Sequence, residues 1–229
     1  MKIVSLIMFF VFSIFIGCTS QGDQLKKNIQ HIIDTSEGTI AVAYKDLVSG
    51  NQLLINDKRV MHAASTMKVP VMIEVFKQAG QGKFSLDDSV TILNQFHSIM
   101  DGSLYSMEIE EDDNDIVMHR IGRKMRIYDL VYHMITVSSN LATNLLIELV
   151  KPENVMKTMT EIGAHSIQVI RGVQDIKAYE AGKSNTTDAY DLMLIMQAIA
   201  EKSILTPSAC DSMIEILSSQ KYDDKIPGL

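Results

Sequence analysis

The sequence predicts an α+β fold in which helices dominate and one short hairpin lies near the N-terminus. Apolar residues at helical spacing predict helices over 24–37, 65–78, 127–136, 141–150, 152–162, 188–202 and 208–220. Residues 39–47 and 52–55 have strand character, and Ser49-Gly50-Asn51 between them has the composition of a hairpin turn. The pattern therefore favours a helical body with a small antiparallel sheet.

Composition is that of a folded domain. Apolar residues make up 46% of the 229 residues and charged residues 21%, which fits one domain or two interleaved lobes that share a core. The net charge of −7 argues against a nucleic-acid partner. Six scattered histidines without paired-ligand spacing argue against a metal site, and no cofactor is expected. Residues 101–115 are acidic and contain glycine, which predicts an exposed loop.

The N-terminus has the pattern of an export signal. Lys2 precedes an almost unbroken apolar run over residues 3–16, which is too short for a comfortable membrane span of about 20 residues. Gly17 stands directly before Cys18, as in a lipoprotein signal cleaved before the cysteine. The alternative is an ordinary secretory signal that happens to contain a cysteine. We expect residues 1–17 to be a lipoprotein signal peptide and 18–229 to be one domain, anchored through a lipid on Cys18 in a bacterial envelope, on its periplasmic or outer side. Cys210, the other cysteine, is expected to be a core residue.

Ser65-Thr66-Met67-Lys68 places a hydroxyl and an amine three residues apart among small and apolar neighbours. A serine hydroxyl is a weak nucleophile and needs a proton acceptor within hydrogen-bond reach. Helix positions i and i+3 share one face, so we expect the Lys68 amine beside the Ser65 hydroxyl. A buried helix start is the alternative interpretation, and Ser218 and Lys221 show the same spacing at the polar end of a predicted helix.

A second motif, Ser138-Ser139-Asn140, joins two predicted helices. A short polar link of this kind can project a hydroxyl and a carboxamide into a cleft. Serine and asparagine are also ordinary helix caps and turn residues, so this motif is weak by itself. The order, separation and flanks of the two motifs make the pair much more specific.

With these motifs the chain, from about Thr39 to its last residue, resembles the class A β-lactamase-like branch of the penicillin-recognising serine enzymes. The resemblance implies an all-helical lobe and an antiparallel sheet lobe with the site between them. It implies that Ser65 is acylated, that Lys68 manages its proton and that Ser138 passes a proton to the leaving lactam nitrogen. Asn140 corresponds to the residue that binds the substrate's side-chain amide. Ser139 stands where aspartate is common.

The family's Ω loop corresponds to residues 171–185 and departs from the family pattern. Arg171 matches the arginine that begins the loop, but Val173 stands where hydrolytic members carry the glutamate that activates the deacylating water. Asp175 or Glu180 could replace that base, and both could equally be solvated loop charges. Asn185 replaces the aspartate that usually pairs with the arginine.

The family's third motif, Lys-Thr-Gly, lies on a C-terminal strand beyond the helix predicted over 208–220, and this sequence ends at Leu229 before one appears. The chain is therefore expected to be a truncated member that lacks the C-terminal strands. The resemblance implies a monomeric serine hydrolase that opens β-lactam antibiotics through an acyl-enzyme and so confers resistance. The alternatives are a penicillin-binding or D-Ala-D-Ala carboxypeptidase-like enzyme, and a β-lactam-binding protein that does not turn over.

Overall fold

The computed structural model describes residues 21–108 and 115–222, and the chain divides into two compact units, residues 1–40 and 41–229. The first unit contains helix α1 (Gln21–Thr35), which begins and ends slightly earlier than the helix predicted over 24–37. Its turns are linked by side-chain hydrogen bonds four residues apart, such as that from Gln30 Nε2 to Asp34 Oδ1 (2.8 Å). Within the described residues, no helix is both long and apolar enough to span a membrane.

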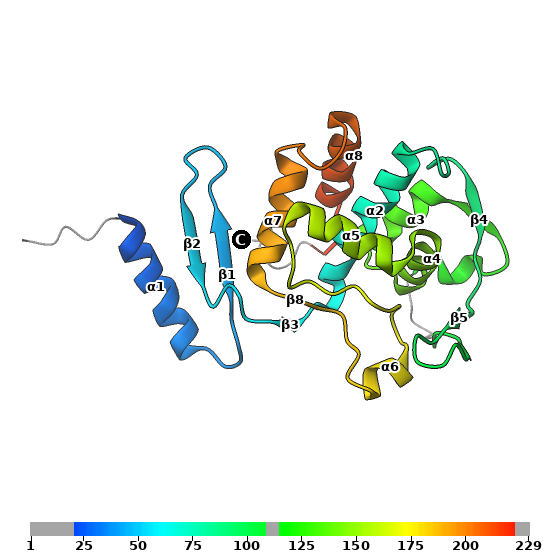
Figure 1. Cartoon of the computed structure of the whole chain (residues 1–229), viewed down its shortest axis with the longest axis horizontal. Helices are drawn as coiled ribbons and strands as arrows, with labels where there is room; N and C mark the ends of the chain where they lie inside the picture. Colours follow the sequence, from blue (N-terminus) through cyan, green and yellow to red (C-terminus); the bar gives the residue numbers. More distant parts are fainter. Residues whose placement is uncertain (1–20, 109–114, 223–229) are drawn as a thin grey trace, which may run out of the picture. The chain divides into compact units, whose positions relative to one another are not determined.

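The second unit opens with the predicted hairpin. Strand β1 (Val42–Lys45) pairs antiparallel with β2 (Gln52–Ile55) (Figure 1). In this ladder Val42 lies opposite Ile55. Asp46 Oδ1 accepts a hydrogen bond from the backbone N–H of Val48 (2.8 Å), which shapes the turn. Strand β1 is shorter than the predicted 39–47: its ladder begins at Val42, opposite the last residue of β2, and stops at Lys45, where this turn begins.

Three smaller antiparallel ladders were not predicted. They pair β3 (Met61–His62) with β8 (Thr186–Thr187), β4 (Ser89–Thr91) with β7 (Lys124–Arg126), and β5 (Phe96–His97) with β6 (Leu104–Tyr105). Strands of two or three residues are too short to show an alternating pattern, so the sequence carries no periodic signal for them.

The helices of the second unit follow the predicted pattern closely. They are α2 (Lys68–Gly80), α3 (Ile127–Thr136), α4 (Asn140–Val150), α5 (Pro152–Ile162), α6 (Ile176–Glu180), α7 (Ala189–Ala200) and α8 (Pro207–Ser218). A short 3₁₀ turn, η1 (Ala64–Met67), directly precedes α2. A second one, η2 (Met118–Arg120), lies between β6 and β7. The five-residue α6 was missed because it is too short for a helical pattern.

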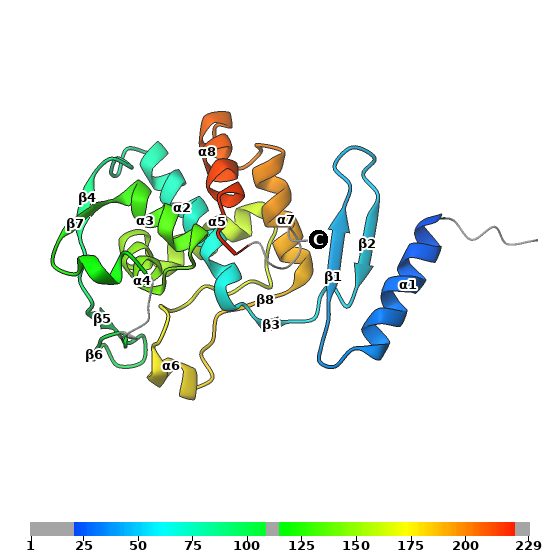
Figure 2. The same ribbon diagram turned by 180° about the vertical axis from the view of Figure 1, so that it is seen from behind.

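Helix α2 lies at the centre of the helical lobe, in contact with α3, α4, α5 and α8, while α7 packs against β1 (Figures 1 and 2). Val71, Met72, Ile73 and Val75 of α2 are fully buried although they point in different directions around the helix. A helix that is apolar all round is typical of a core position. Cys210 of α8 is buried in the same core, as predicted. The α+β prediction is confirmed.

The prediction of an exposed loop over 101–115 is right for the exposed turn at residues 101–102 but wrong for two later parts of the segment. Residues 104–105 form strand β6, Met107 is buried, and Asp115 is only 8% exposed. Residues 109–114 lie outside the described part of the chain. The charge pattern concealed the anchoring residues, because apolar and acidic positions are interleaved in this segment.

Candidate active site

Ser65 and Lys68 stand on consecutive elements at the start of the central helix. Ser65 lies in the 3₁₀ turn η1, while Lys68 is the first residue of α2, so the α-helix begins later than the predicted residue 65. The Ser65 side chain is exposed, whereas Lys68 is only 3% exposed. A hydroxyl open to solvent is thus followed within one turn by a buried amine.

The Lys68 ammonium is surrounded by oxygens from the link between α3 and α4. Its Nζ donates to the carbonyl oxygen of Ser138 (2.6 Å), to Ser138 Oγ (2.8 Å) and to Asn140 Oδ1 (2.9 Å). An ammonium has three N–H donors, and these three oxygens use all of them. Burial of the charge is therefore compensated by hydrogen bonds.

Ser138 connects the lysine to the exposed serine. The hydroxyl oxygens of Ser65 and Ser138 lie 2.8 Å apart, and either of them can be the donor. Lys68 makes no direct hydrogen bond to Ser65 among the described residues. The sequence predicted that the Lys68 amine would lie beside the Ser65 hydroxyl, but Ser138 stands between them.

The conformation of the α3–α4 link explains how Ser138 reaches this position. Ser138 has a φ of 57°, in the left-handed region that non-glycine residues rarely adopt. Ser139, the N-cap of α4, accepts a hydrogen bond from the backbone N–H of Ala142 (3.1 Å) through its Oγ. The sharp turn before the cap directs Ser138 and Asn140 towards the same ammonium.

The pKa of Lys68 is lowered to about 8, chiefly because burial disfavours the charged form, and the negative charge of Asp115 opposes this effect. The Asp115 carboxylate accepts a short hydrogen bond from Ser139 Oγ. Sequence reasoning missed Asp115, because the many acids around it predict a solvated, exposed segment. The apolar residues that follow it, Val117 and Met118, are the signal that could have indicated burial.

Hydrogen bonds to its backbone N–H and carbonyl group fix the position of Val173 in the loop. Asn144 of α4 accepts a hydrogen bond from the Val173 N–H through Oδ1 (2.6 Å) and donates to the Val173 carbonyl through Nδ2 (2.9 Å). The Tyr105 hydroxyl donates to the same carbonyl (3.2 Å), and burial raises the pKa of that hydroxyl to about 12. The loop is firmly placed here, yet the side chain at this position is apolar. Neither Asn144 nor Tyr105 was singled out from the sequence.

Arg171 and Asn185 are also in contact, but the Asn185 side chain binds the backbone of Arg171 and not its guanidinium. Asn185 Oδ1 accepts from the Arg171 N–H (3.1 Å), and Asn185 Nδ2 donates to the Arg171 carbonyl (3.0 Å). The buried Arg171 guanidinium donates instead to the carbonyl oxygens of Lys183 (2.7 Å) and Gly172 (3.0 Å). The two residues that match the ends of the Ω loop therefore join its base without an ion pair.

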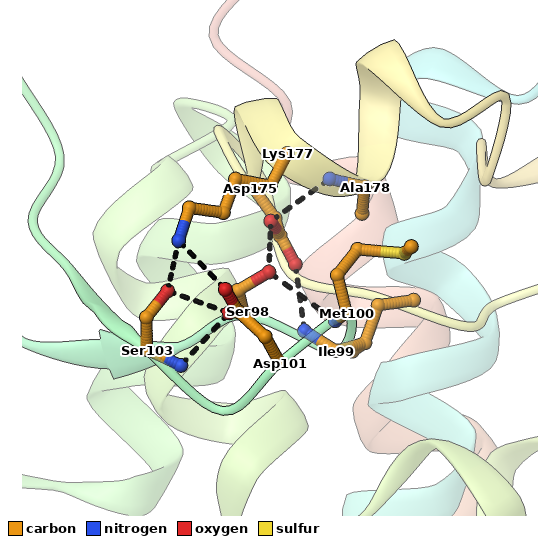
Figure 3. A network of polar contacts seen from close by, with 8 residues as sticks. All are labelled: Ser98, Ile99, Met100, Asp101, Ser103, Asp175, Lys177 and Ala178. Carbon is orange, nitrogen blue, oxygen red and sulfur yellow. Dashed lines mark hydrogen bonds and ion pairs between the residues drawn. The ribbon is translucent and has the colours of Figure 1, made fainter.

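Asp175 is only 1% exposed, and its hydrogen bonds fasten the loop to the segment around Ser98 (Figure 3). Its carboxylate accepts from Ser98 Oγ (2.8 Å), from the Ile99 N–H (2.9 Å) and, as the N-cap of α6, from the Ala178 N–H (3.2 Å). Nearby, Lys177 Nζ donates to Asp101 Oδ2 (2.8 Å) and Ser103 Oγ (2.6 Å). These contacts lie within the loop and its neighbour, not at Ser65 or Lys68.

Glu180, the second carboxylate considered as a base, is the last residue of α6 and is exposed. The structure therefore brings Ser65, Lys68, Ser138 and Asn140 into one hydrogen-bonded group. It does not join Asp175 or Glu180 to that group. Among the described residues, no cluster of histidine, cysteine or acidic side chains is arranged to hold a metal ion.

We predict that Gly172→Ala disturbs this loop, because an added Cβ would lie 2.8 Å from both Asn144 Oδ1 and the Tyr105 hydroxyl. Displacing these groups loosens the hydrogen bonds to Val173, and we expect a loss of about 1–3 kcal/mol in the free energy of unfolding. Urea unfolding measures the change. Gly80→Ala is the control, since nothing lies within 4 Å of its added Cβ. A Gly172→Ala protein that unfolds at the same urea concentration as the wild type would contradict the prediction.

Comparisons with known proteins identify the family and the fold. A family model described as Beta-lactamase2, the beta-lactamase enzyme family, matches residues 24–229. Among solved structures, a beta-lactamase from Sphaerobacter thermophilus superposes with a TM-score of 0.72 at 23% sequence identity, over 89% of this chain and 72% of that one. A structure of PBP-A superposes with a TM-score of 0.73 at 23% identity, over 89% of this chain and 71% of that one.

A beta-lactamase from Xanthomonas campestris has a TM-score of 0.74 at 17% identity, over 89% of this chain and 72% of that one. No curated protein matches the chain. At these identities the solved structures establish the fold, which is the β-lactamase/transpeptidase-like fold with its helical lobe. The family model covers most of the sequence, and the chain therefore belongs to the beta-lactamase enzyme family.

Proposed function

We propose that this chain is a serine acyl-enzyme that opens β-lactams through an ester on Ser65. The observation that carries the proposal is the continuous hydrogen-bonded path from the exposed Ser65 hydroxyl through Ser138 Oγ to Lys68 Nζ. An amine whose pKa lies at about 8 has an appreciable neutral fraction near neutral pH, so it can accept a proton. Family membership supports the same reaction class.

In the proposed reaction, neutral Lys68 withdraws a proton along the path while Ser65 Oγ attacks the lactam carbonyl carbon. The carbon–nitrogen bond of the lactam then breaks and leaves the acyl group as an ester on Ser65. Ser138 delivers a proton to the departing nitrogen and is reprotonated from Lys68, so no proton is gained or lost. Asn140 contributes to binding, because Lys68 occupies its Oδ1 and leaves the amide N–H₂ to donate to a substrate carbonyl.

A second candidate function is a β-lactam-binding protein, or a penicillin-binding enzyme, that forms the ester but releases it slowly. The observation that favours it is the apolar Val173, whose backbone is fixed by Asn144. The carboxylate of Asp175 is already occupied by three donors. Deacylation needs a base that aims water at the ester, and the loop presents none in these contacts.

We further propose that the protein is exported and anchored to the bacterial envelope through a lipid on Cys18. The support is the sequence pattern of Lys2, the apolar run and Gly17-Cys18, all of which lie outside the described residues. An envelope location agrees with an enzyme that meets β-lactams before they reach their targets.

The first prediction concerns the nucleophile. In the protein as its gene encodes it, Ser65→Ala should abolish covalent labelling by a fluorescent penicillin, because no ester can form without Ser65 Oγ. Gel fluorescence and intact-protein mass spectrometry measure the label. Ser218→Ala is the matched control: Ser218, the last residue of α8, also has a lysine three residues later, Lys221. This variant should be labelled normally. Undiminished labelling of Ser65→Ala would refute the assignment.

The second prediction concerns pH. Lys68 acts as a base only when it is neutral, and its pKa of about 8 means that the neutral fraction rises as the pH increases through this value. The acylation rate should therefore increase about tenfold between about pH 7 and about pH 9 and then level off. Stopped-flow measurements of labelling give the profile. Lys68→Arg stays charged throughout this range and should not acylate at any of these pH values; a flat wild-type profile would contradict the prediction.

The third prediction concerns turnover. If no base assists deacylation, the ester should accumulate, since general-base assistance is worth roughly 10²–10⁴-fold in rate. A chromogenic cephalosporin should give a burst followed by a slow steady state, with the adduct detectable by mass spectrometry. Val173→Glu, which restores a carboxylate at this position, is expected to shorten the adduct lifetime. Fast linear turnover by the wild type without a trapped adduct would rule out slow release.

The fourth prediction concerns the anchor. Radiolabelled fatty acid should enter the wild-type protein but not Cys18→Ser, because the lipid is attached through the cysteine sulfur. Cys210→Ala is the control and should incorporate lipid normally, since Cys210 is buried in the core. Equal incorporation by the wild type and Cys18→Ser would exclude an anchor at this position.

A further inference from the structure

A buried carboxylate from a distant segment contacts the link between α3 and α4. Asp115 is 8% exposed and Ser139 is 2% exposed, and Ser139 Oγ donates a short hydrogen bond to Asp115 Oδ2. The two residues are 24 positions apart in sequence. A carboxylate so deeply buried needs hydrogen bonds to remain charged, and this hydroxyl supplies one of them.

The Ser139 side chain makes two hydrogen bonds that fix its orientation. Its hydroxyl has a single proton, which goes to Asp115, while its oxygen accepts from the Ala142 N–H (3.1 Å) at the start of α4. Ser139 lies between Ser138 and Asn140, the two residues whose oxygens surround Lys68 Nζ. Holding the middle residue thus restrains both of its functional neighbours.

Asp115 is itself fixed by local contacts. Its Oδ1 accepts from the Val117 N–H (2.9 Å), and its carbonyl oxygen accepts from the Met118 N–H (3.0 Å). Val117 is fully buried and Met118 is 5% exposed, so both anchor this turn in the core. The carboxylate is therefore placed before any substrate binds, which is what a positioning group needs.

The charge of Asp115 also acts on the lysine. It raises the pKa of Lys68 against the larger, opposite effect of burial. Within residues 21–108 and 115–222, Asp115 is the charged group that opposes the effect of burial. Its carboxylate thus stabilises the ammonium form electrostatically, while its hydrogen bond to Ser139 acts on the geometry around the same group.

We propose that Asp115 is a positioning residue for the Ser65–Ser138–Lys68 group. Acting through Ser139, its carboxylate fixes the left-handed turn that carries Ser138 and provides the negative charge opposite Lys68. The catalytic meaning of this inference rests on the proposed function, whereas its structural part concerns the resting protein alone.

The test separates geometry from charge with two variants. Ser139→Ala keeps the carboxylate but removes the link, so the acylation rate at high pH should fall on the order of tenfold with little change in the midpoint of the pH profile. Asp115→Asn removes the charge, so the plateau should fall and the midpoint should also move to lower pH. The direction follows because the Lys68 pKa drops below about 8 when an opposing negative charge is lost. Loss of packing alone would expose Lys68 to water and move the midpoint in the opposite direction, to higher pH, because burial is what lowers the Lys68 pKa.

Rescue provides the stricter criterion. Aspartate is a good N-cap, so Ser139→Asp combined with Asp115→Asn returns a carboxylate to the same contact and still caps α4. The double variant should recover most of the acylation rate and the wild-type midpoint. Ser139→Asp alone places a second buried carboxylate beside Asp115. Because two like charges repel, this variant should be less stable near neutral pH than at acidic pH. Failure of the double variant to recover would overturn the proposal.

A measurement on the resting protein keeps this proposal distinct from the proposed function. Carbon-13 labelling of the lysine Cε atoms allows Lys68 to be titrated by NMR, with Lys68→Met for assignment. Asp115→Asn should lower its titration midpoint, whereas Glu108→Gln, which removes an exposed charge from the same segment, should not. If penicillin fails to label even the wild type, the proposed function fails while this titration still decides the role of Asp115. An unchanged Lys68 midpoint in Asp115→Asn would refute it.

Discussion

Burial of the Lys68 ammonium is the constraint on which the site depends. A charge that is only 3% exposed must be surrounded by oxygens, and three of them come from the short link between α3 and α4. This demand stabilises the left-handed conformation of Ser138, which otherwise costs about 1–2 kcal/mol. The same turn places Ser138 Oγ beside Ser65, so one electrostatic requirement positions both the proposed base, Lys68, and its link to the proposed nucleophile, Ser65.

The sequence predicted the parts of this arrangement that are encoded locally. Helices α3 and α5 have the predicted bounds because their apolar faces are long and end at clear caps or turns. The two serine motifs, which the sequence analysis paired, also lie in contact in the structure through Ser65 and Ser138. The bridging place of Ser138 was not predictable, because helical spacing says which residues share a face but not which of two hydroxyls an amine will reach. The role of Asp115 was not predictable for a related reason, since charge patterning cannot distinguish a buried acid from its solvated neighbours.

The loop over 171–185 shows how a segment can keep its place while its chemistry changes. Polar contacts with the 96–108 segment and with Asn144 hold its backbone, and Asp175 fastens it to Ser98 (Figure 3). The Asp175 carboxylate already accepts three hydrogen bonds, so its oxygens are engaged in holding the loop. Rigidity of the loop and reactivity of its acids are therefore separate properties, and here the acid contributes to rigidity.

The hydrogen bonds of Lys68 suit both of its protonation states. As an ammonium it donates to three oxygens; as a neutral amine it has two donors and one lone pair. The Ser138 carbonyl and Asn140 Oδ1 can only accept, so they retain the two donors, and the lone pair is left for the Ser138 hydroxyl proton. Ser138 Oγ is then free to accept from Ser65, 2.8 Å away. Deprotonation of Lys68 alone thus orients the hydrogen bonds from Ser65 towards Lys68, which is the direction that the proposed acylation requires, without movement of any heavy atom.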